Sequence, residues 1–325
     1  MTIRQVTLGC SALLGMGIVI LDGKTALSGA AEGIGLCIQT VVPALFPFFL
    51  FSILLTSAFV GSEIRILRPL GALFPIPKGA ESLLIAAFLG GYPVGAQTIA
   101  VAYHNGQLNK HDAERMLAFC SNAGPSFLFG IIGQMFSDRK TPWILWGIHI
   151  ISAWMASCLL PHRQGTAKLG QAQVSVSQAM AAAVKTMAMV CGWVVLFRVI
   201  LAFGDRWFLW LFPREVQVVF SGILELTNGC CNLNQISSPG LRFVICSGIL
   251  ALGGLCVALQ TLSVTKGLSM HYYCLGKLMQ CAFSLVLSTA IVLKLWLLPV
   301  LALISFAIIS RKTKNFGSNP EKAVV

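Results

Sequence analysis

Residues 83–103 read LLIAAFLGGYPVGAQTIAVAY, an apolar stretch that is long enough to cross a bilayer. Its centre is interrupted by GGYP at residues 90–93, a run of turn-forming residues. Every backbone polar group in lipid must be satisfied within the protein. A break at membrane depth is therefore tolerated only where protein or a cavity surrounds it. This stretch predicts a helical membrane protein that has a broken helix near its centre.

The composition of the whole chain supports the same class. The 325 residues are 56% hydrophobic and only 10% charged, against about 25% charged in an ordinary soluble domain. The mean hydropathy is +0.81. These values exclude a soluble globular protein and a disordered one. The apolar runs are continuous, whereas a transmembrane β-barrel needs alternating segments of about ten residues.

The net charge of +12 would suggest a nucleic-acid partner in a soluble protein. Here the basic residues lie in short loops and in the C-terminal tail, which is typical of cytoplasm-facing segments of membrane proteins. The expected partner is therefore the lipid bilayer, with no nucleic acid. We expect a multi-pass integral protein of the cell membrane, and the sequence leaves homo-oligomerisation open.

The chain predicts an all-α polytopic fold with roughly eight transmembrane helices and additional broken or re-entrant hairpins. The predicted spans are 6–21, 41–60, 142–160, 180–203, 207–226, 241–264, 272–292 and 295–309. The segment 24–40 carries apolar residues on one helical face, and we expect it to lie at the membrane interface. Residues 109–120 predict a charged amphipathic helix with Asn109 as its N-cap.

Two halves are expected. The longest polar linker lies near the middle of the chain, and both halves contain polar interruptions of apolar runs. The segments GGYPVGAQT and GGLCVALQT, 163 residues apart, share the pattern G-G-x-x-V-x-x-Q-T and predict a pseudo-repeat. Paired interruptions in two halves are typical of a transporter's central site. The predicted division is 1–160 for the first half, 161–175 for the linker, 176–310 for the second half and 311–325 for a basic cytoplasmic tail.

Glu225 is the strongest single candidate for function. No other carboxylate lies between Glu215 and Glu321. A charge at the bilayer centre costs about 2.5–3.5 kcal/mol on insertion scales, so it usually faces a cavity or a partner. Glu225 is thus predicted to bind a ligand or carry a proton. The alternatives are a structural ion pair with Lys185 or Arg198, or a position at a helix end near water.

The polar breaks form a second set of candidates. A helix that resumes after a break presents free N–H groups, which favour anions. Tyr92 and Asn122 stand in such breaks, Gln97 and Gln260 would orient a ligand, and Lys185 would neutralise an anionic one. The alternative is helix packing through small residues and interhelical hydrogen bonds.

Signatures of catalysis and of cofactor binding are missing from the sequence. It has no HExxH, GxSxG, Walker A or dinucleotide fingerprint, and its eleven cysteines show no CxxC spacing. We therefore expect no metal site, no cofactor and no enzymatic activity.

Five segments together carry a resemblance to a known family. They are PALFPFFLFSILL (43–55), GGYPVGAQT (90–98), DAERMLAFCSNAGPSFLFG (112–130), GILELTNG (222–229) and GGLCVALQ (253–260). The chain resembles the sporulation integral membrane protein YlbJ family over residues 24–300. That family carries the nucleoside-recognition or Gate domain and is distantly similar to concentrative nucleoside transporters.

The resemblance implies helical hairpins that meet at the membrane midplane and a role in moving a small metabolite. For YlbJ-like proteins of endospore formers, the implied cargo is dipicolinate, an aromatic dianion. The CysCysAsnLeuAsn stretch after Gly229 departs from the family pattern and puts the cargo in doubt. By motif, the substrate-binding positions would be Tyr92, Gly95 and Gln97 in the first hairpin, Asn122 and Ser126 in the next helix, and Glu225, Thr227 and Asn228 in the second half.

The sequence thus predicts a transporter or permease of the Gate type, with a small anionic metabolite such as dipicolinate as its substrate. One alternative is an ion-coupled nucleoside or nucleobase transporter. An alternative from another class is a membrane assembly or scaffold protein that transports nothing.

Overall fold

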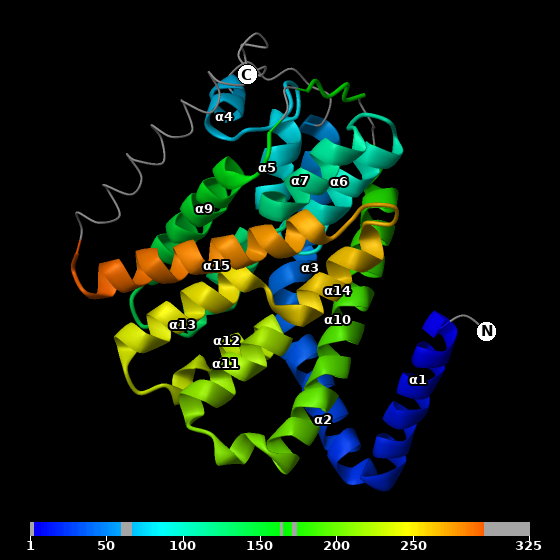
Figure 1. Ribbon diagram of the computed structural model, residues 1–325, viewed down its shortest axis with the longest axis vertical. Coiled ribbons are helices and arrows are strands. Elements are labelled where there is room, and N and C mark those ends of the chain that lie inside the picture. Colours follow the sequence, from blue (N-terminus) through cyan, green and yellow to red (C-terminus); the bar gives the residue numbers. More distant parts are fainter. Residues whose placement is uncertain (1–2, 60–66, 163–164, 171–173, 296–325) are drawn as a thin grey trace, which may run out of the picture.

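The computed structural model describes residues 3–59, 67–162, 165–170 and 174–295, and within these ranges all regular elements are helices. Figure 1 shows them as a bundle in which α1 lies apart from the rest. The helices of the first half are α1 (Ile3–Leu21), α2 (Gly23–Leu36), α3 (Val42–Phe59), α4 (Arg68–Leu73), α5 (Glu81–Gly90), α6 (Val94–His104), α7 (Lys110–Cys120), α8 (Pro125–Gly130) and α9 (Thr141–Leu159). Those of the second half are α10 (Val176–Trp207), α11 (Arg214–Leu224), α12 (Leu226–Cys231), α13 (Pro239–Leu252), α14 (Gly254–Val264) and α15 (His271–Val292).

Six helical segments in the described ranges are long and apolar enough to cross a membrane: Gly23–Phe59, Lys110–Gln134, Thr141–Leu159, Val176–Trp207, Pro239–Val264 and His271–Val292. The all-α polytopic fold is therefore confirmed, with about six spans in place of the expected eight. The predicted span 207–226 is instead a short 3₁₀ turn followed by α11, which has only 11 residues. The predicted span 295–309, the tail 311–325 and part of the linker lie outside the described residues.

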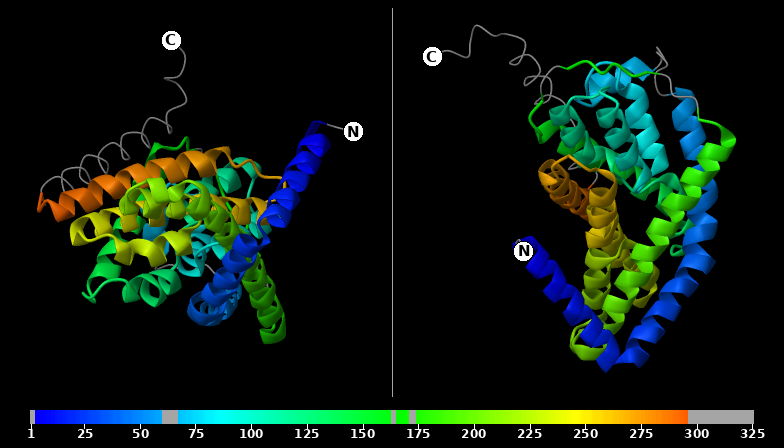
Figure 2. Two further views of the ribbon diagram at one scale, coloured as in Figure 1. Left: turned by 90° about the horizontal axis from the view of Figure 1, so that it is seen from below. Right: turned by 90° about the vertical axis from the view of Figure 1, so that its right-hand side faces the viewer.

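The segment expected at the membrane interface is part of a long span. A π-helical turn at Cys37–Val41 joins α2 to α3, so that residues 23–59 form one helical segment. This segment runs beside α10, as both views in Figure 2 show. Gly29 and Gly33 allow the close approach: a Cβ at Gly29 would stand 3.0 Å from the Val199 Cα atom, and one at Gly33 would stand 2.9 Å from the Val195 Cα atom. The small-residue face of this segment, with Gly29 and Gly33, thus packs against α10, whereas its large apolar residues Leu27, Ile34 and Ile38 stay exposed.

Polar contacts reinforce the same helix pair. Arg198 Nε of α10 donates a hydrogen bond to Glu32 Oε2 of α2 at 2.9 Å, and within α10 Arg198 Nη1 donates to Asp205 Oδ2 at 3.2 Å. Arg198 therefore pairs with these two carboxylates and not with Glu225, which corrects one of the alternatives considered for Glu225. Lys185, the other proposed partner, is exposed on α10.

Asp22 fixes the corner between α1 and α2. Its side chain caps α2 by accepting hydrogen bonds from the Thr25 hydroxyl at 2.8 Å and from the Thr25 backbone N–H. Arg206 Nε of α10 lies 2.7 Å from Asp22 Oδ2. These contacts, the side-chain hydrogen bond from Thr25 first among them, hold the pKa of the Asp22 carboxyl below its usual value.

Two helix pairs form hairpins. α5 and α6 fold back on each other, because Gly95 lies so close to α5 that a Cβ there would stand 2.9 Å from the Ala87 carbonyl oxygen. α11 and α12 do the same, with a Cβ at Gly229 falling 2.3 Å from the Gly222 Cα atom. In contrast, α7–α8 and α13–α14 are broken helices that continue across the molecule. The predicted interruption of residues 83–103 is therefore the turn of a hairpin.

The turns and breaks meet at the centre of the bundle. A Cβ at Gly91 in the first hairpin would stand 2.7 Å from the Gly124 backbone nitrogen in the break of α7–α8. A Cβ at Gly254 in the break of α13–α14 would stand 2.8 Å from the Gly222 carbonyl oxygen in the second hairpin. Gly91 and Gly254 have φ values of +69° and +78°, so glycine serves both the turn conformation and the close approach.

The element order repeats, but not as the matched segments suggested. The hairpin α5–α6, the broken helix α7–α8 and the helix α9 are followed in the second half by the hairpin α11–α12, the broken helix α13–α14 and the helix α15. α9 begins at Thr141 and α15 at His271, 130 residues later. GGYPVGAQT thus lies in a hairpin, whereas GGLCVALQT lies in a broken helix. The similarity at 163 residues joins elements that are not equivalent in the fold. The two hairpins approach the centre from opposite ends of the bundle in Figure 1.

The packing of α15 on α7 gives a test of the fold. A Cβ at Gly276 would stand 2.5 Å from the Ala118 Cβ atom and 2.7 Å from its carbonyl oxygen. Gly276→Ala should therefore lower the Tm of the purified protein in detergent, because overpacking costs about 1–3 kcal/mol. Tryptophan fluorescence during heating measures this change.

Gly192→Ala is the matched control. Gly192 lies within α10, and a Cβ there meets nothing within 4 Å. Alanine is the better helix former by about 0.5–1 kcal/mol, so the control should keep or raise the Tm. Equal Tm values for the two variants would contradict the close contact of α15 with α7.

Candidate functional site

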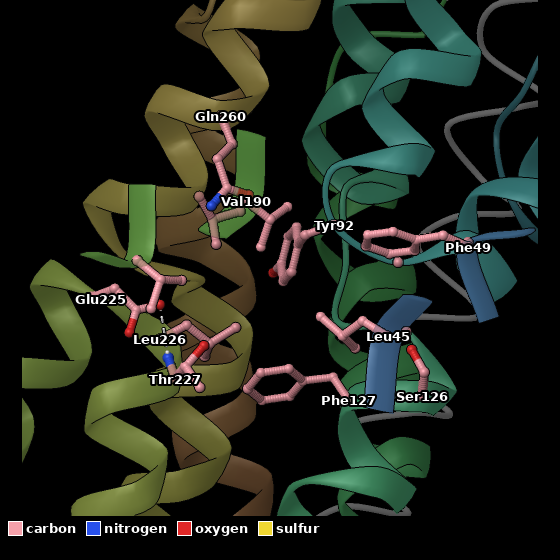
Figure 3. Close-up of a pocket in the computed structure, with 15 residues that line it drawn as sticks. Leu45, Phe49, Tyr92, Ser126, Phe127, Val190, Glu225, Leu226, Thr227 and Gln260 are labelled. Carbon is pink, nitrogen blue, oxygen red and sulfur yellow. Dashed lines mark hydrogen bonds between the residues drawn. The ribbon is translucent and has the colours of Figure 1, made fainter. Parts of the chain in front are cut away.

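A pocket lies at the centre, between the two halves of the chain. Figure 3 shows the first-half side chains, Phe49 and Phe127 among them, facing second-half side chains such as Glu225 and Gln260. The lining comes from α3, from the turn of the hairpin α5–α6, from the start of α8, and from α10, α12 and α14. The lining residues that carry polar side chains are Tyr92, Ser126, Glu225, Thr227 and Gln260.

Glu225 stands at the turn of the second hairpin and is 2% exposed. Its backbone is extended, with φ −143° and ψ 118°, so α11 ends before it and α12 begins after it. Its Oε1 accepts a hydrogen bond from the Thr227 N–H at 3.0 Å, and its Oε2 accepts from the Asn228 N–H and from Asn228 Nδ2, both at 2.7 Å. The carboxylate therefore caps α12 and is held in one orientation, while it also lines the pocket.

The other walls are largely aromatic and aliphatic. Tyr92, Phe49 and Phe127 enclose the pocket, and Figure 3 shows the Tyr92 ring between Phe49 and the second-half residues. The cavity has a volume of about 30 Å³. That is near the room taken by one water molecule, whereas drug-sized ligands occupy pockets of about 300–1,000 Å³. The pocket is therefore too small for a drug-sized ligand in this conformation.

The N-terminal ends of the broken and hairpin helices surround the pocket. Tyr92 lies two residues before the start of α6, Ser126 lies in the first turn of α8, Thr227 in the first turn of α12, and Gln260 in the second turn of α14. The first N–H groups of a helix have no partner within the helix and carry a partial positive charge. Glu225 binds the first N–H groups of α12, and the first turns of α8 and α14 also contribute to the lining.

Few of the described residues that line the pocket are ionisable. Among the described residues that line the pocket, Glu225 and Tyr92 are the ones that can titrate. No lysine or arginine side chain is part of that lining. No side chain in the described lining therefore brings a positive charge into direct contact with the pocket.

The predicted substrate-binding residues divide into three groups. Tyr92, Ser126, Glu225, Thr227 and Gln260 line the pocket. Asn228 lies behind Glu225 and orients it, and Asn122 belongs to a neighbouring polar cluster. The structure does not bring Gly95, Gln97 and Lys185 to the pocket. Gly95 packs against α5 and the Cys120 carbonyl, Gln97 is half-buried on α6, and Lys185 is exposed.

The neighbouring polar cluster is centred on Lys277 of α15, which is 2% exposed. Its ammonium donates hydrogen bonds to Gln280 Oε1 at 2.7 Å, to Asn122 Oδ1 at 3.1 Å and to the Tyr92 hydroxyl at 3.3 Å. Gln280 Nε2 donates in turn to Asn122 Oδ1 at 3.0 Å and to the His149 carbonyl at 3.2 Å. Tyr92 thus belongs both to the pocket wall and to this cluster.

His149 of α9 supplies a hydrogen-bond acceptor to the backbone in the break of α7–α8. Its Nε2 accepts a hydrogen bond from the Ala123 N–H at 3.1 Å. An accepting Nε2 carries no proton, so the imidazole is neutral with its proton on Nδ1. The charge of this cluster therefore comes from Lys277.

Lys277, Gln280 and His149 were not among the residues predicted from the sequence. A signal was present for the first two, because a lysine and a glutamine three residues apart in the apolar run 272–292 lie on one helical face. No local pattern connects them to residues 92 and 122, which lie more than 150 positions earlier.

Comparison with known proteins finds one similar protein. The chain is 24% identical over 320 residues to the sporulation integral membrane protein YlbJ of Bacillus subtilis strain 168, covering 82% of this chain and 78% of that protein. No family model and no solved structure matches the chain. The name of this relative, an integral membrane protein, agrees with the apolar helices of the structure. The chain is a multi-pass integral membrane protein that is similar to YlbJ over most of its length.

Proposed function

We propose that this protein is a membrane carrier that moves a small planar anionic metabolite, such as dipicolinate, through its central pocket during sporulation. The observation that carries the proposal is the pocket itself, which lies between two halves of repeated element order and is surrounded by the starts of broken helices. Broken helices that meet at a central site between repeats are the arrangement by which many secondary transporters bind substrate. The name of the Bacillus subtilis relative supports the sporulation context.

The lining suits a flat ring with acidic groups. Tyr92, Phe49 and Phe127 offer aromatic surface for a ring, and helix N-termini favour carboxylates. The positive potential belongs to the backbone and stays in place when a ligand leaves. The field is weaker than that of an arginine, which suits a carrier that must release its cargo.

Glu225 would link anion movement to a proton. An ionised carboxylate in the pocket repels an anionic ligand at short range, and this repulsion is strong where water is excluded. A proton on Glu225 removes the repulsion, so anion and proton would occupy the pocket together. Hydrogen bonds from Thr227 and Asn228 to the carboxylate hold it at the pocket wall in the empty protein.

The small volume of the pocket requires that a part of the protein moves to admit a ligand. The hairpin turn at Gly91 and Tyr92 covers the pocket from the first half, and the turn at Glu225 covers it from the second. A ligand of ring size enters when one of these turns moves away from its neighbours. Hairpins joined to the bundle at one end are suited to this motion.

A nucleoside is the second candidate cargo, and one observation favours it. The pocket has a carboxylate and an amide, Glu225 and Gln260, but no lysine or arginine in the described lining. A carboxylate accepts hydrogen bonds from ribose hydroxyls, and an amide pairs with a base edge. A membrane scaffold that transports nothing is the remaining alternative.

The first experiment is a ligand-induced thermal shift. Dipicolinate should raise the Tm of the purified protein, because a ligand at 100 times its Kd stabilises the folded state by about 2.7 kcal/mol. Gln260→Ala should abolish or greatly reduce the shift, since this side chain lines the pocket. Gln97→Ala is the matched control and should keep the full shift, because Gln97 lies outside the pocket.

A panel of nucleosides in the same assay separates the two cargo classes. A shift with nucleosides alone would replace dipicolinate by the second candidate. Equal loss of the shift in both glutamine variants would contradict the location of the site. No shift with either class would refute both cargo assignments and favour the scaffold.

The second experiment tests the role of Glu225 in proteoliposomes. An imposed pH gradient should drive uptake of labelled dipicolinate by the unmodified protein. Glu225→Gln keeps the shape of the side chain but cannot exchange a proton. It should lower gradient-driven uptake at least tenfold, while the protein still inserts into the liposomes.

Lys185→Ala serves as the control for general charge effects, because Lys185 is exposed on α10. It should transport at the rate of the unmodified protein. Gradient-driven uptake by Glu225→Gln at the normal rate would show that Glu225 only caps α12. Absence of uptake in every variant, the unmodified protein included, would favour the scaffold.

A further inference from the structure

Lys277 is a buried lysine without a carboxylate partner. In the part of the chain that the structure describes, no ion pair involves it. Its three N–H groups are matched by three oxygen atoms, those of Tyr92, Asn122 and Gln280. Burying a charge without such partners would cost a large free energy. These oxygens therefore form a binding site for a cation.

The oxygens come from three separate parts of the fold. Tyr92 belongs to the turn of the hairpin α5–α6, Asn122 to the break in α7–α8, and Gln280 to α15. The Lys277 ammonium also lies 5.3 Å from the centroid of the Tyr92 ring, close enough for a cation–π contact. One positive charge therefore holds the hairpin turn against the break.

The C-terminal ends of two helices add a favourable field. Tyr92 Oη donates a hydrogen bond to the Leu250 carbonyl in the last turn of α13 at 3.3 Å. Asn122 Nδ2 donates to the Phe119 carbonyl in the last turn of α7 at 2.5 Å. The ammonium thus faces side chains that are themselves bound to helix C-termini, which carry partial negative charge. In broken-helix transporters, C-terminal ends and unwound backbone are where Na⁺ binds.

We propose that the Lys277 ammonium is a resident cation, which takes the place of an exchangeable alkali-metal ion between the hairpin α5–α6, the break of α7–α8 and helix α15. The hairpin turn then closes over the pocket without any metal ion from solution. This role concerns closure of the hairpin and holds whichever cargo the pocket takes. Lys277 is a positioning residue, because it does not line the pocket itself.

Removing the ammonium should convert the site into one that takes a free cation. Lys277→Ala leaves the oxygens of Tyr92, Asn122 and Gln280 around an empty space in the same low-dielectric surroundings. The test compares the Tm of the purified protein in LiCl, NaCl, KCl and choline chloride at equal ionic strength, so that general screening is constant. The unmodified protein should show the same Tm in all four salts.

Lys277→Ala should have a lower Tm than the unmodified protein in choline chloride. It should recover at least half of the difference in one of the alkali chlorides, and the recovery should grow with the logarithm of the cation concentration. Lys185→Ala, which removes an exposed lysine, is the matched control and should respond to none of the salts.

Two outcomes would overturn the proposal. A folded Lys277→Ala protein with the same Tm in all four salts would show that its oxygens form no cation site. A Tm of the unmodified protein that depends on Na⁺ would show that an exchangeable cation is still needed. A cargo-induced thermal shift can survive either result, so failure here is distinct from failure of the carrier proposal.

A second pair of variants decides the matter if Lys277→Ala folds in no salt. Lys277→Arg keeps the positive charge, whereas Lys277→Met keeps the volume without it. A resident cation requires that the arginine variant yields folded protein in the membrane and the methionine variant does not. The reverse result would mean that packing volume is what the site needs, and would overturn the proposal.

Discussion

The fold depends on the hydrogen bonds that satisfy broken backbone at membrane depth. Each interruption has side-chain partners that replace water. His149 accepts from the Ala123 N–H, Asn122 donates to the Phe119 carbonyl, Tyr92 donates to the Leu250 carbonyl, and Glu225 accepts from two N–H groups of α12. Without these partners, each free backbone group would cost several kcal/mol in lipid. The polar residues at the centre are therefore required by the fold before any ligand is considered.

The broken helices create one region that favours an anion and another that favours a cation. Helix N-termini surround the pocket and make it favourable for an anion, whereas the C-terminal ends of α7 and α13 lie on the side of Lys277 and favour a cation. Glu225 and Lys277 each stand where the helix dipoles stabilise their charge. Tyr92 lies between them, with its ring at the pocket wall and its hydroxyl on the ammonium. A movement of the first hairpin therefore changes both sites together.

Local signals in the sequence predicted the local structure well. Asn109 caps α7 as expected, the breaks at residues 91–93 and 121–124 were found, and Glu225 was identified as a buried carboxylate. Each of these follows from residues that are neighbours in the chain. The expected interface helix at 24–40 was wrong because Gly29 and Gly33 pack against α10, a partner more than 160 residues away. The residue pattern at 90–93 indicated only a break, and the family resemblance supplied the hairpin, because tertiary contact decides that α5 and α6 fold back on each other.

The residues of the central site, too, could be predicted only in part from the sequence. Tyr92, Ser126, Thr227 and Gln260 could be selected as polar residues beside breaks, and all four line the pocket. Gln97 has the same chemistry and a similar distance from its break, yet it faces another direction on α6. Lys185 and Lys277 are both lysines within apolar helices, and only the second meets oxygen atoms from a hairpin turn, from the break of another helix and from its own helix. Residue type and depth mark candidates, whereas the crossing of the broken helices decides which of them share a site.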